Sequence, residues 1–157
     1  MSNNQNTDTK TESPKPAPTD QIVQTQHRVT IGGQAIAYTV TTGTIILKEE
    51  SEKKGEQAGE SEGEKPKASV FFIAYTRDES NSSDHVSDKT KRPLTFSFNG
   101  GPGSSSVWLH LGVLGPRRVV MTDEGDLLPP PFRLTDNEYS LLDVTDLVFI
   151  DPVSTGF

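Results

Sequence analysis

Two kinds of segment alternate along the chain: short runs of β-branched and aromatic residues, and long polar stretches. From Gln26 the runs HRVTI, QAIAYTV and TIIL follow one another, separated by short turns that contain glycine. In the second run Ile36, Tyr38 and Val40 alternate with smaller or polar residues, which is typical of a strand with one buried face. The pattern predicts an antiparallel β-meander that continues, after an interruption, at residues 68–76.

Three polar stretches lie outside these runs. Residues 1–20 hold hardly any apolar side chain and cannot bury enough surface to offset the entropy of ordering, which predicts a disordered tail. Residues 48–67 are almost all Glu, Lys, Gly, Ser and Gln, and residues 77–92 are also polar. Each of these two stretches is predicted to be a surface loop between strands, within a domain that spans residues 26–157.

A strand, a tight turn and a helix are predicted in that order from Leu94. Leu94, Phe96 and Phe98 alternate with Thr and Ser, and the glycine turn NGGPG, residues 99–103, follows at once. Three serines and the apolar run VWLHLGVL come next. Adjacent glycines allow backbone NH groups to point outward, Pro102 restricts one torsion, and a serine can cap the helix.

Such a turn is a preformed site for an anion. Proteins use this geometry to bind phosphate and to stabilise an oxyanion during acyl transfer. Phosphate binding is less well supported, because no lysine follows the glycines and no G-x-G-x-x-G pattern is present. A plain glycine turn that binds no ligand is the third interpretation.

Composition excludes several classes of function. The formal net charge is −7, which argues against nucleic acid or an anionic membrane surface as a partner. The chain has no cysteine, so a disulfide scaffold and a thiolate metal site are excluded. No signal-like start and no apolar run of about 18 residues are present, which predicts a soluble, cytoplasmic protein. No metal ion and no cofactor are predicted, and the oligomeric state stays open.

One motif in the first polar stretch is deceptive. Residues 59–63, GESEG, match the G-x-S-x-G pattern in which a strained strand-to-helix turn presents a nucleophilic serine. No apolar strand precedes Gly59, no apolar helix follows Gly63, and the surrounding carboxylates would disfavour an anionic intermediate. A chance match in a polar loop is the better interpretation.

The segment FNGGPGSSS, residues 98–106, closely resembles the N-G-G-P-G-[CS]-S-S signature of the serine carboxypeptidase family. Two later segments are similar to the same family: Leu114-Gly115-Pro116, and residues 137–157. The resemblance covers roughly residues 90–157. It implies an α/β fold in which this chain is the N-terminal, incomplete part of an α/β-hydrolase sheet, with the antiparallel meander leading into the oxyanion strand and the first helix.

The resemblance also implies roles for three positions of the turn. Gly101 matches the residue whose backbone NH supplies half of the family's oxyanion hole. Asn99 and Gly100 match positions that bind the free C-terminal carboxylate of a peptide, which would be the partner. The implied activity is that of a serine-type carboxypeptidase, which hydrolyses C-terminal peptide bonds through an acyl-enzyme.

Two departures from the family pattern qualify this expectation. Val113 falls where eukaryotic members carry a glutamate that helps to bind the substrate carboxylate, so substrate preference stays open. A related acyltransferase, an amide or ester hydrolase, and a non-catalytic module that binds an anion or a peptide terminus therefore remain alternatives. The family's G-E-S-Y-[AG]-G nucleophile motif and its later aspartate and histidine are not in this sequence, so the chain is predicted to be an inactive N-terminal fragment.

Other candidate residues are predicted to be structural. The three histidines, His27, His85 and His110, are interpreted as structural or solvated. Asp143, Asp146 and Asp151 flank the apolar run LVFI and are expected to end it or to accept backbone hydrogen bonds. Trp108, the only tryptophan, is expected to be a core anchor.

Overall fold

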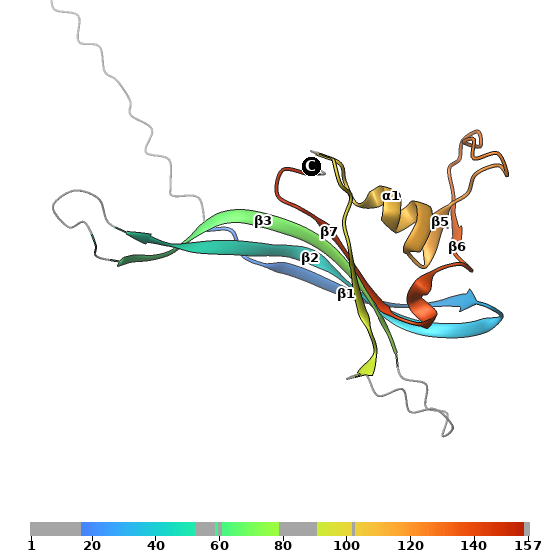
Figure 1. The fold of residues 1–157 in the computed structure, drawn as a ribbon, viewed down its shortest axis with the longest axis horizontal. Helices are drawn as coiled ribbons and strands as arrows, with labels where there is room; N and C mark the ends of the chain where they lie inside the picture. The colour runs from blue at the N-terminus through green and yellow to red at the C-terminus, as the bar shows by residue number, and fades with distance from the viewer. Residues whose placement is uncertain (1–16, 53–58, 60, 79–90, 102, 156–157) are drawn as a thin grey trace, which may run out of the picture.

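The computed structural model describes residues 17–52, 59, 61–78, 91–101 and 103–155. These residues form a five-stranded sheet in the order β1-β2-β3-β7-β4, a two-stranded sheet β5-β6, and a short helical segment against one face of the larger sheet (Figure 1). In chain order the elements are β1 (Gln21–Ile31), β2 (Gln34–Glu52), β3 (Ser61–Arg77), β4 (Leu94–Ser97), α1 (Val107–Leu109), η3 (His110–Leu114), β5 (Arg117–Val119), β6 (Leu134–Asp136), η4 (Leu141–Asp143) and β7 (Asp146–Asp151).

The antiparallel meander predicted from the alternating runs is confirmed. β1 pairs with β2 from Gln21↔Thr44 to Ile31↔Gln34, and β2 pairs with β3 from Tyr38↔Arg77 onward. Gly32 and Gly33 both have positive φ, as the tight turn between β1 and β2 requires. β1 begins at Gln21 instead of Gln26, and residues 1–16 of the predicted tail lie outside the described residues.

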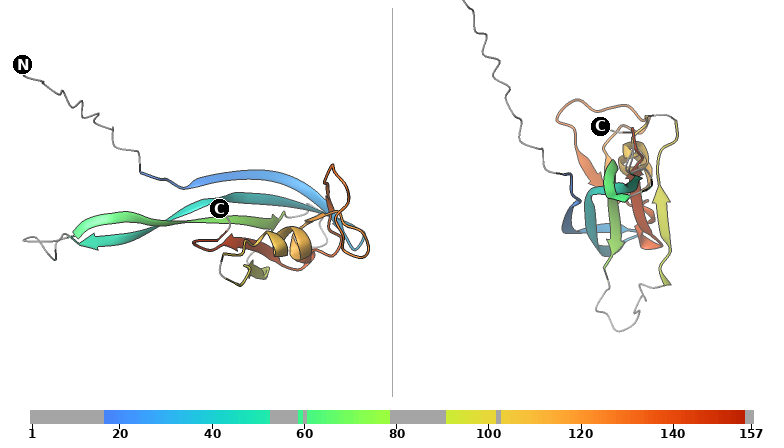
Figure 2. Two further views of the ribbon diagram at one scale, coloured as in Figure 1. Left: turned by 90° about the horizontal axis from the view of Figure 1, so that it is seen from above. Right: turned by 90° about the vertical axis from the view of Figure 1, so that its left-hand side faces the viewer.

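The loop predicted for residues 48–67 is wrong in large part. β2 continues to Glu52 and β3 begins at Ser61, so both strands extend beyond Gln21, where β1 begins, as an arm formed by residues 45–52 and 61–70 (Figure 2). Lys67 pairs with Glu49 across the arm, with 2.8 Å between Nζ and Oε2. Polar residues suit these strands because the arm has solvent on both faces, so strand pairing there does not need apolar alternation.

Both ends of the second polar stretch, residues 77–92, are hydrogen-bonded to β7. Arg77 is the last residue of β3 and donates through its backbone NH to Asp146 Oδ1 at 3.0 Å. Arg92 Nε donates to the same oxygen at 3.0 Å. Residues 79–90, the middle of the predicted loop, lie outside the described residues.

The mixed α/β character comes from the second half of the chain. β4 and β7 are parallel neighbours, from Leu94↔Asp146 to Ser97↔Phe149, and the helical segment lies between them in sequence. β7 pairs on its other side with β3 in the antiparallel direction. A parallel pair needs a crossover connection, which here carries the glycine turn and the helix.

The core lies between the sheet and this crossover. Its buried apolar side chains come from four strands and from η4: Val29, Ile31, Ile36, Tyr38, Tyr75, Leu142, Leu147 and Phe149. Alternate residues of β7 point into this core, so Leu147 and Phe149 are buried and Val148 is only half-buried. One face of the sheet is therefore packed by the chain itself.

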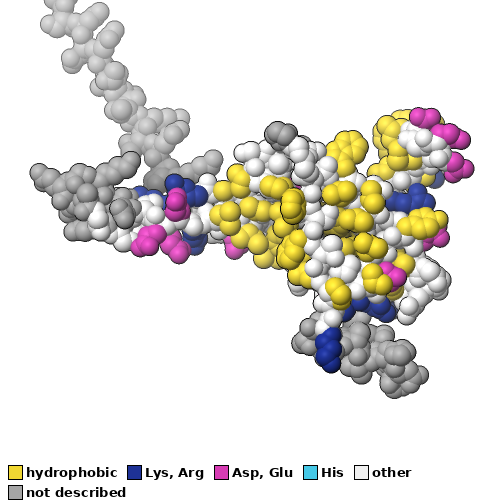
Figure 3. Space-filling model, in the orientation of Figure 1, with side chains coloured by type: hydrophobic (Ala, Val, Ile, Leu, Met, Phe, Trp, Pro, Cys, Tyr) yellow, Lys and Arg dark blue, Asp and Glu magenta, His cyan; other side chains and the backbone are white. Residues whose placement is uncertain are grey.

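The opposite face of the sheet is open. Leu94 and Phe96 of β4 and Phe98, which follows the strand, have 53%, 57% and 59% of their surfaces exposed. Figure 3 has the orientation of Figure 1, with the helical segment above the strands, and shows apolar side chains over the middle of the molecule and charged side chains on the arm, at the right and at the lower edge. Contiguous exposed apolar surface on a sheet normally marks a place where another layer packs.

Among the described residues no helix has the length and apolar character needed to cross a membrane.

Replacement of Gly43 by alanine is expected to separate the start of β1 from β2. A Cβ atom at Gly43 would lie 2.0 Å from the carbonyl oxygen of Gln21 and 3.0 Å from the Cα atom of Ile22. Both are backbone atoms, so the strand itself must move. Amide hydrogen exchange should show faster exchange for residues 21–26 in Gly43→Ala, with little change at the end of β1.

Thr44→Ala is the matched control, since it alters the next residue of β2 without placing an atom against β1. Equal exchange of residues 21–26 in wild type and Gly43→Ala would show that the two strands are not this close.

Candidate functional site

The glycine turn follows β4 at the carboxyl end of the parallel pair. Gly101 and Gly103 both have φ of 81°, a conformation that residues with a Cβ atom adopt only with strain. Gly100 and Gly101 are exposed and Asn99 is half-buried. Asn99, Gly100 and Gly101, the three positions predicted from the sequence, therefore lie together at the surface of one turn.

The turn is closed by its own backbone and by Asn99. Ser104 N donates to the carbonyl oxygen of Gly101 at 3.3 Å, and Asn99 Nδ2 donates to Ser104 Oγ at 3.4 Å. In the described part of the chain these bonds use the carbonyl of Gly101 and leave its NH without a protein acceptor. Asn99 Oδ1 is buried and has no hydrogen-bond partner among the described residues. The turn therefore presents an NH group suited to an anionic oxygen.

The two residues before α1, Ser105 and Ser106, form hydrogen bonds with the end of β7. Ser106 N donates to Asp151 Oδ1 at 2.7 Å, and Ser105 Oγ donates to the same carboxylate at 3.1 and 3.2 Å. Ser106 Oγ donates to the carbonyl oxygen of Ile150 and accepts from Asn99 N at 3.4 Å. The expectation that Asp151 accepts backbone hydrogen bonds is confirmed, although its serine partners were not foreseen.

His110 anchors the helical segment to the core. Its Nε2 lies 2.5 Å from the hydroxyl oxygen of Tyr75, and its ring centroid lies 4.8 Å from that of Phe149. Burial lowers the pKa of His110 to about 4, although the negative charge of Asp151 acts in the opposite direction. Burial also raises the pKa of the Tyr75 hydroxyl. Both side chains are therefore uncharged at neutral pH, and His110 has the structural role predicted for it.

The far end of the helical segment is held by buried polar side chains. Asn137 Nδ2 donates to the carbonyl oxygens of Val113 at 2.9 Å and Gly115 at 2.8 Å, and Ser140 Oγ donates to that of Leu114 at 2.7 Å. These bonds satisfy carbonyls that the helix end would otherwise leave unpaired. Asn137 and Ser140 belong to residues 137–157, the segment that resembles the family, and the sequence alone indicated no role for either side chain.

Three other residues singled out in the sequence, Trp108, Val113 and Ser61, lie away from the turn or the core. Trp108 was expected in the core, but 69% of its surface is exposed, because α1 turns Leu109 and His110 toward the sheet instead. Val113 is also exposed and brings no polar atom to the surface. Ser61, the central residue of the deceptive motif, starts β3 and donates to Glu50 Oε1 at 2.9 Å, so it lies on the arm and not at a strand-to-helix turn.

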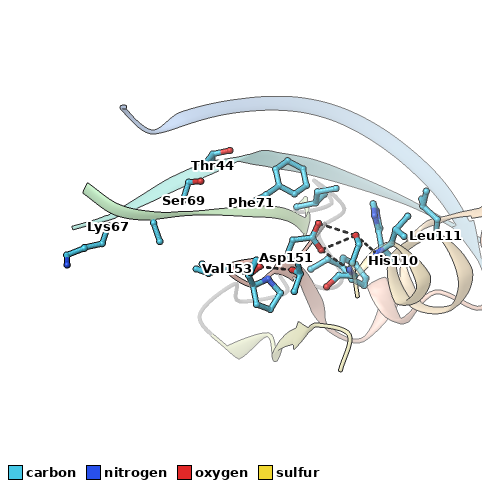
Figure 4. A pocket seen from close by; sticks show the side chains of 17 residues that line it. Thr44, Lys67, Ser69, Phe71, His110, Leu111, Asp151 and Val153 are labelled. Carbon is cyan, nitrogen blue, oxygen red and sulfur yellow. Dashed lines mark hydrogen bonds between the residues drawn. The ribbon is translucent and has the colours of Figure 1, made fainter. Parts of the chain in front are cut away.

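A groove of about 670 Å³ lies beside the turn, on the helix-bearing face of the sheet (Figure 4). Phe71, Ile73 and Phe149 are among its apolar lining residues, and Ser105 and Asp151 contribute polar atoms. Asn99, Gly100 and Gly101 are not among the residues that line it. The groove and the glycine turn are thus separate features that share the Ser105–Asp151 contact as a common wall.

No group of three or more His, Cys, Asp or Glu side chains within the described ranges is placed to hold a metal ion.

Acidification is expected to destabilise the fold through His110. Between pH 6.5 and about 4 the unfolded chain binds a proton at this residue that the folded chain does not, so stability is present above this window and is lost as the pH falls through it. The loss should be roughly 2–3 kcal/mol. Urea unfolding at pH 7 and pH 4.5 should therefore show a larger decrease for wild type than for His110→Gln.

His27→Gln is the control, because His27 is exposed on β1. It should follow the wild-type pH dependence, and a His110→Gln variant that does so too would rule out this source of acid sensitivity.

Alanine at the two adjacent glycines of the turn should have unequal effects. At Gly101 the φ of 81° makes a Cβ atom cost about 1–2 kcal/mol of stability. At Gly100 the φ is not in this region and a Cβ atom meets no other atom within 4 Å, so the change should stay within about 0.5 kcal/mol. Urea unfolding of both variants measures the difference. Equal stabilities would argue against the turn geometry described above.

The family model described as serine carboxypeptidase matches residues 53–157. The chain is 39% identical over 88 residues to the pheromone-processing carboxypeptidase KEX1 of Saccharomyces cerevisiae strains S288c and JAY291. The aligned region is 55% of this chain and 10% of each relative, so the chain spans about a tenth of the length of the curated relatives it matches. No solved structure matches the chain closely enough to support a comparison. Because the family model covers more than half of the chain, the protein belongs to the serine carboxypeptidase family.

Proposed function

We propose that this chain is the oxyanion-binding and carboxylate-binding part of a serine carboxypeptidase-like peptidase. The observation that carries the proposal is the glycine turn: among the described residues the NH of Gly101 has no acceptor, while Ser106 bonds both to Asn99 and to Asp151 of β7. Catalysis of acyl transfer needs donors that are already oriented before charge develops on the substrate oxygen. A turn held at both ends meets that requirement.

The proposed chemistry divides the turn between two anions. Gly101 NH donates to the oxyanion that forms when a serine attacks the C-terminal peptide carbonyl. Asn99 and Gly100 donate to the free carboxylate of the peptide, through an amide NH₂ and a backbone NH. This division selects chain ends, because an internal peptide bond has no carboxylate at that position.

We propose further that the nucleophile and its histidine and aspartate partners are supplied by residues outside the printed sequence. His110 is bonded to Tyr75 in the core, and Ser61 lies on the arm, so neither is placed to act beside Gly101. The exposed apolar face formed by Leu94, Phe96 and Phe98 supports this proposal, because a second layer of an α/β-hydrolase fold would cover it. The 157 residues alone should then show no turnover.

A non-catalytic module that binds a peptide terminus is the second candidate. It is supported by the same NH of Gly101, which has no acceptor among the described residues, and it needs no nucleophile. Both candidates predict that the turn binds a carboxylate. They differ in one respect: the peptidase should hydrolyse peptides when its catalytic residues are present, and the binding module should not.

The test is an NMR titration of the ¹⁵N-labelled chain with N-acetyl-phenylalanine and, as a matched control, with its C-terminal amide. The carboxylate ligand is expected to shift the amide signals of Gly100 and Gly101 and the side-chain amide of Asn99, and the neutral ligand is expected to shift them much less. Release of free phenylalanine from N-acetyl-phenylalanine should stay at the rate of a blank.

Equal shifts with both ligands, or none with either, would overturn carboxylate recognition. Release above the blank would overturn the proposal that the chain lacks its catalytic residues.

A further inference from the structure

The carboxylate of Asp151 connects two parts of the fold that would otherwise be independent. It ends β7, whose backbone is held by β3 on one side, with Asp151 paired to Phe71. Its two oxygens accept from the hydroxyl of Ser105, and Oδ1 also accepts from the NH of Ser106. The first residues after the glycine turn are thereby bonded to a strand that is paired on both sides, with β3 and with β4 (Figure 4).

A second bond from the neighbouring residue makes this attachment rigid. Ser106 is buried, and its hydroxyl donates to the carbonyl oxygen of Ile150 while accepting from Asn99 N. Ser106 therefore bonds at once to β7 and to Asn99, two residues after the end of β4. The turn between Asn99 and Ser106 is a closed loop whose two ends are held a fixed distance apart.

The groups that form hydrogen bonds with the Asp151 side chain are all donors, which explains why a carboxylate suits this position. One backbone NH and one hydroxyl converge on Asp151, and an ionised carboxylate offers only acceptors. An asparagine could still accept from Ser106 N through Oδ1, but its NH₂ group would replace the second acceptor. The bonds to a charged group are also stronger than neutral ones. The negative charge is favourable beside the first NH groups of a helical segment.

We infer that Asp151 is a positioning residue that holds the glycine turn in the orientation in which the NH of Gly101 faces a ligand. It acts through Ser105 and Ser106 and does not touch the ligand. The inference deepens the proposed function and rests on it for the identity of the ligand. Gly101 and Gly103 allow the turn to move, because glycine restricts the backbone least, so the restraint has to come from the ends of the loop.

The test compares three variants of the full 157-residue chain. Asp151→Ala removes both acceptors, Asp151→Asn keeps one of them, and Asp123→Ala removes the same charge from the loop between β5 and β6. Backbone ¹⁵N order parameters of Gly101 and Gly103 report the rigidity of the turn. Hydrogen exchange at Leu147, in the core strand, reports global stability.

Asp151→Ala should lower the order parameters of Gly101 and Gly103 from about 0.85 towards 0.6, with exchange at Leu147 changed less than about threefold. Asp151→Asn should retain most of the wild-type order, and Asp123→Ala all of it. Ser105→Ala, which keeps the bond from Ser106 N, is the milder variant if Asp151→Ala fails to fold. It should also lower the two order parameters, by a smaller amount.

Unchanged order parameters in Asp151→Ala or, where that variant does not fold, in Ser105→Ala would overturn the inference. Equal acceleration of exchange at Leu147 and at the turn would overturn it too, because the aspartate would then contribute only to global stability.

Titration with N-acetyl-phenylalanine separates this inference from the proposed function. If wild type binds and Asp151→Ala binds about tenfold more weakly, both are supported. If wild type binds and Asp151→Ala binds equally well, the positioning role is wrong while the proposed function stands. If wild type does not bind, the proposed function fails, and the order parameters alone decide whether Asp151 holds the turn.

Discussion

The insertion of β7 between β3 and β4 is the constraint on which the rest of the structure depends. β7 is antiparallel to one neighbour and parallel to the other, so it joins the meander to the α/β half of the chain. Its inner residues Leu147 and Phe149 complete the core. Its two ends carry aspartates that accept hydrogen bonds, Asp146 from the residues around the second polar stretch and Asp151 from the residues after the glycine turn.

The site combines two requirements that oppose each other. Its glycines must adopt positive φ so that NH groups face outward, and this freedom alone would leave the turn mobile. The surroundings supply the rigidity: Ser106 bonds to Ile150 of β7 and to Asn99 at the start of the turn, and His110 fixes the helical segment against Tyr75 and Phe149. Preorganised donors of this kind are what stabilisation of an oxyanion requires, since reorientation during the reaction would cost energy.

Local patterns predicted some elements well and failed at others for identifiable reasons. The meander and the strand–turn–helix order followed from alternation and from the NGGPG segment, both of which are short-range signals. The arm was missed, because a hairpin with solvent on both faces shows no alternation. Trp108 was predicted to lie in the core on the assumption that its helical face is buried. The helical segment consists of the three residues of α1 and the π-helical turn η3, and it buries His110 instead of Trp108.

The sequence by itself determined the conformational freedom of the turn, the positions of most strands and the family of the protein, because these depend on residue types at adjacent positions. Tertiary structure alone decided that Asp151 meets Ser105 and Ser106, which lie 46 and 45 residues away, and that His110 meets Tyr75, 35 residues away. Such contacts depend on which strands become neighbours. That order is set by burial of the whole apolar face and is not encoded in any local run of residues.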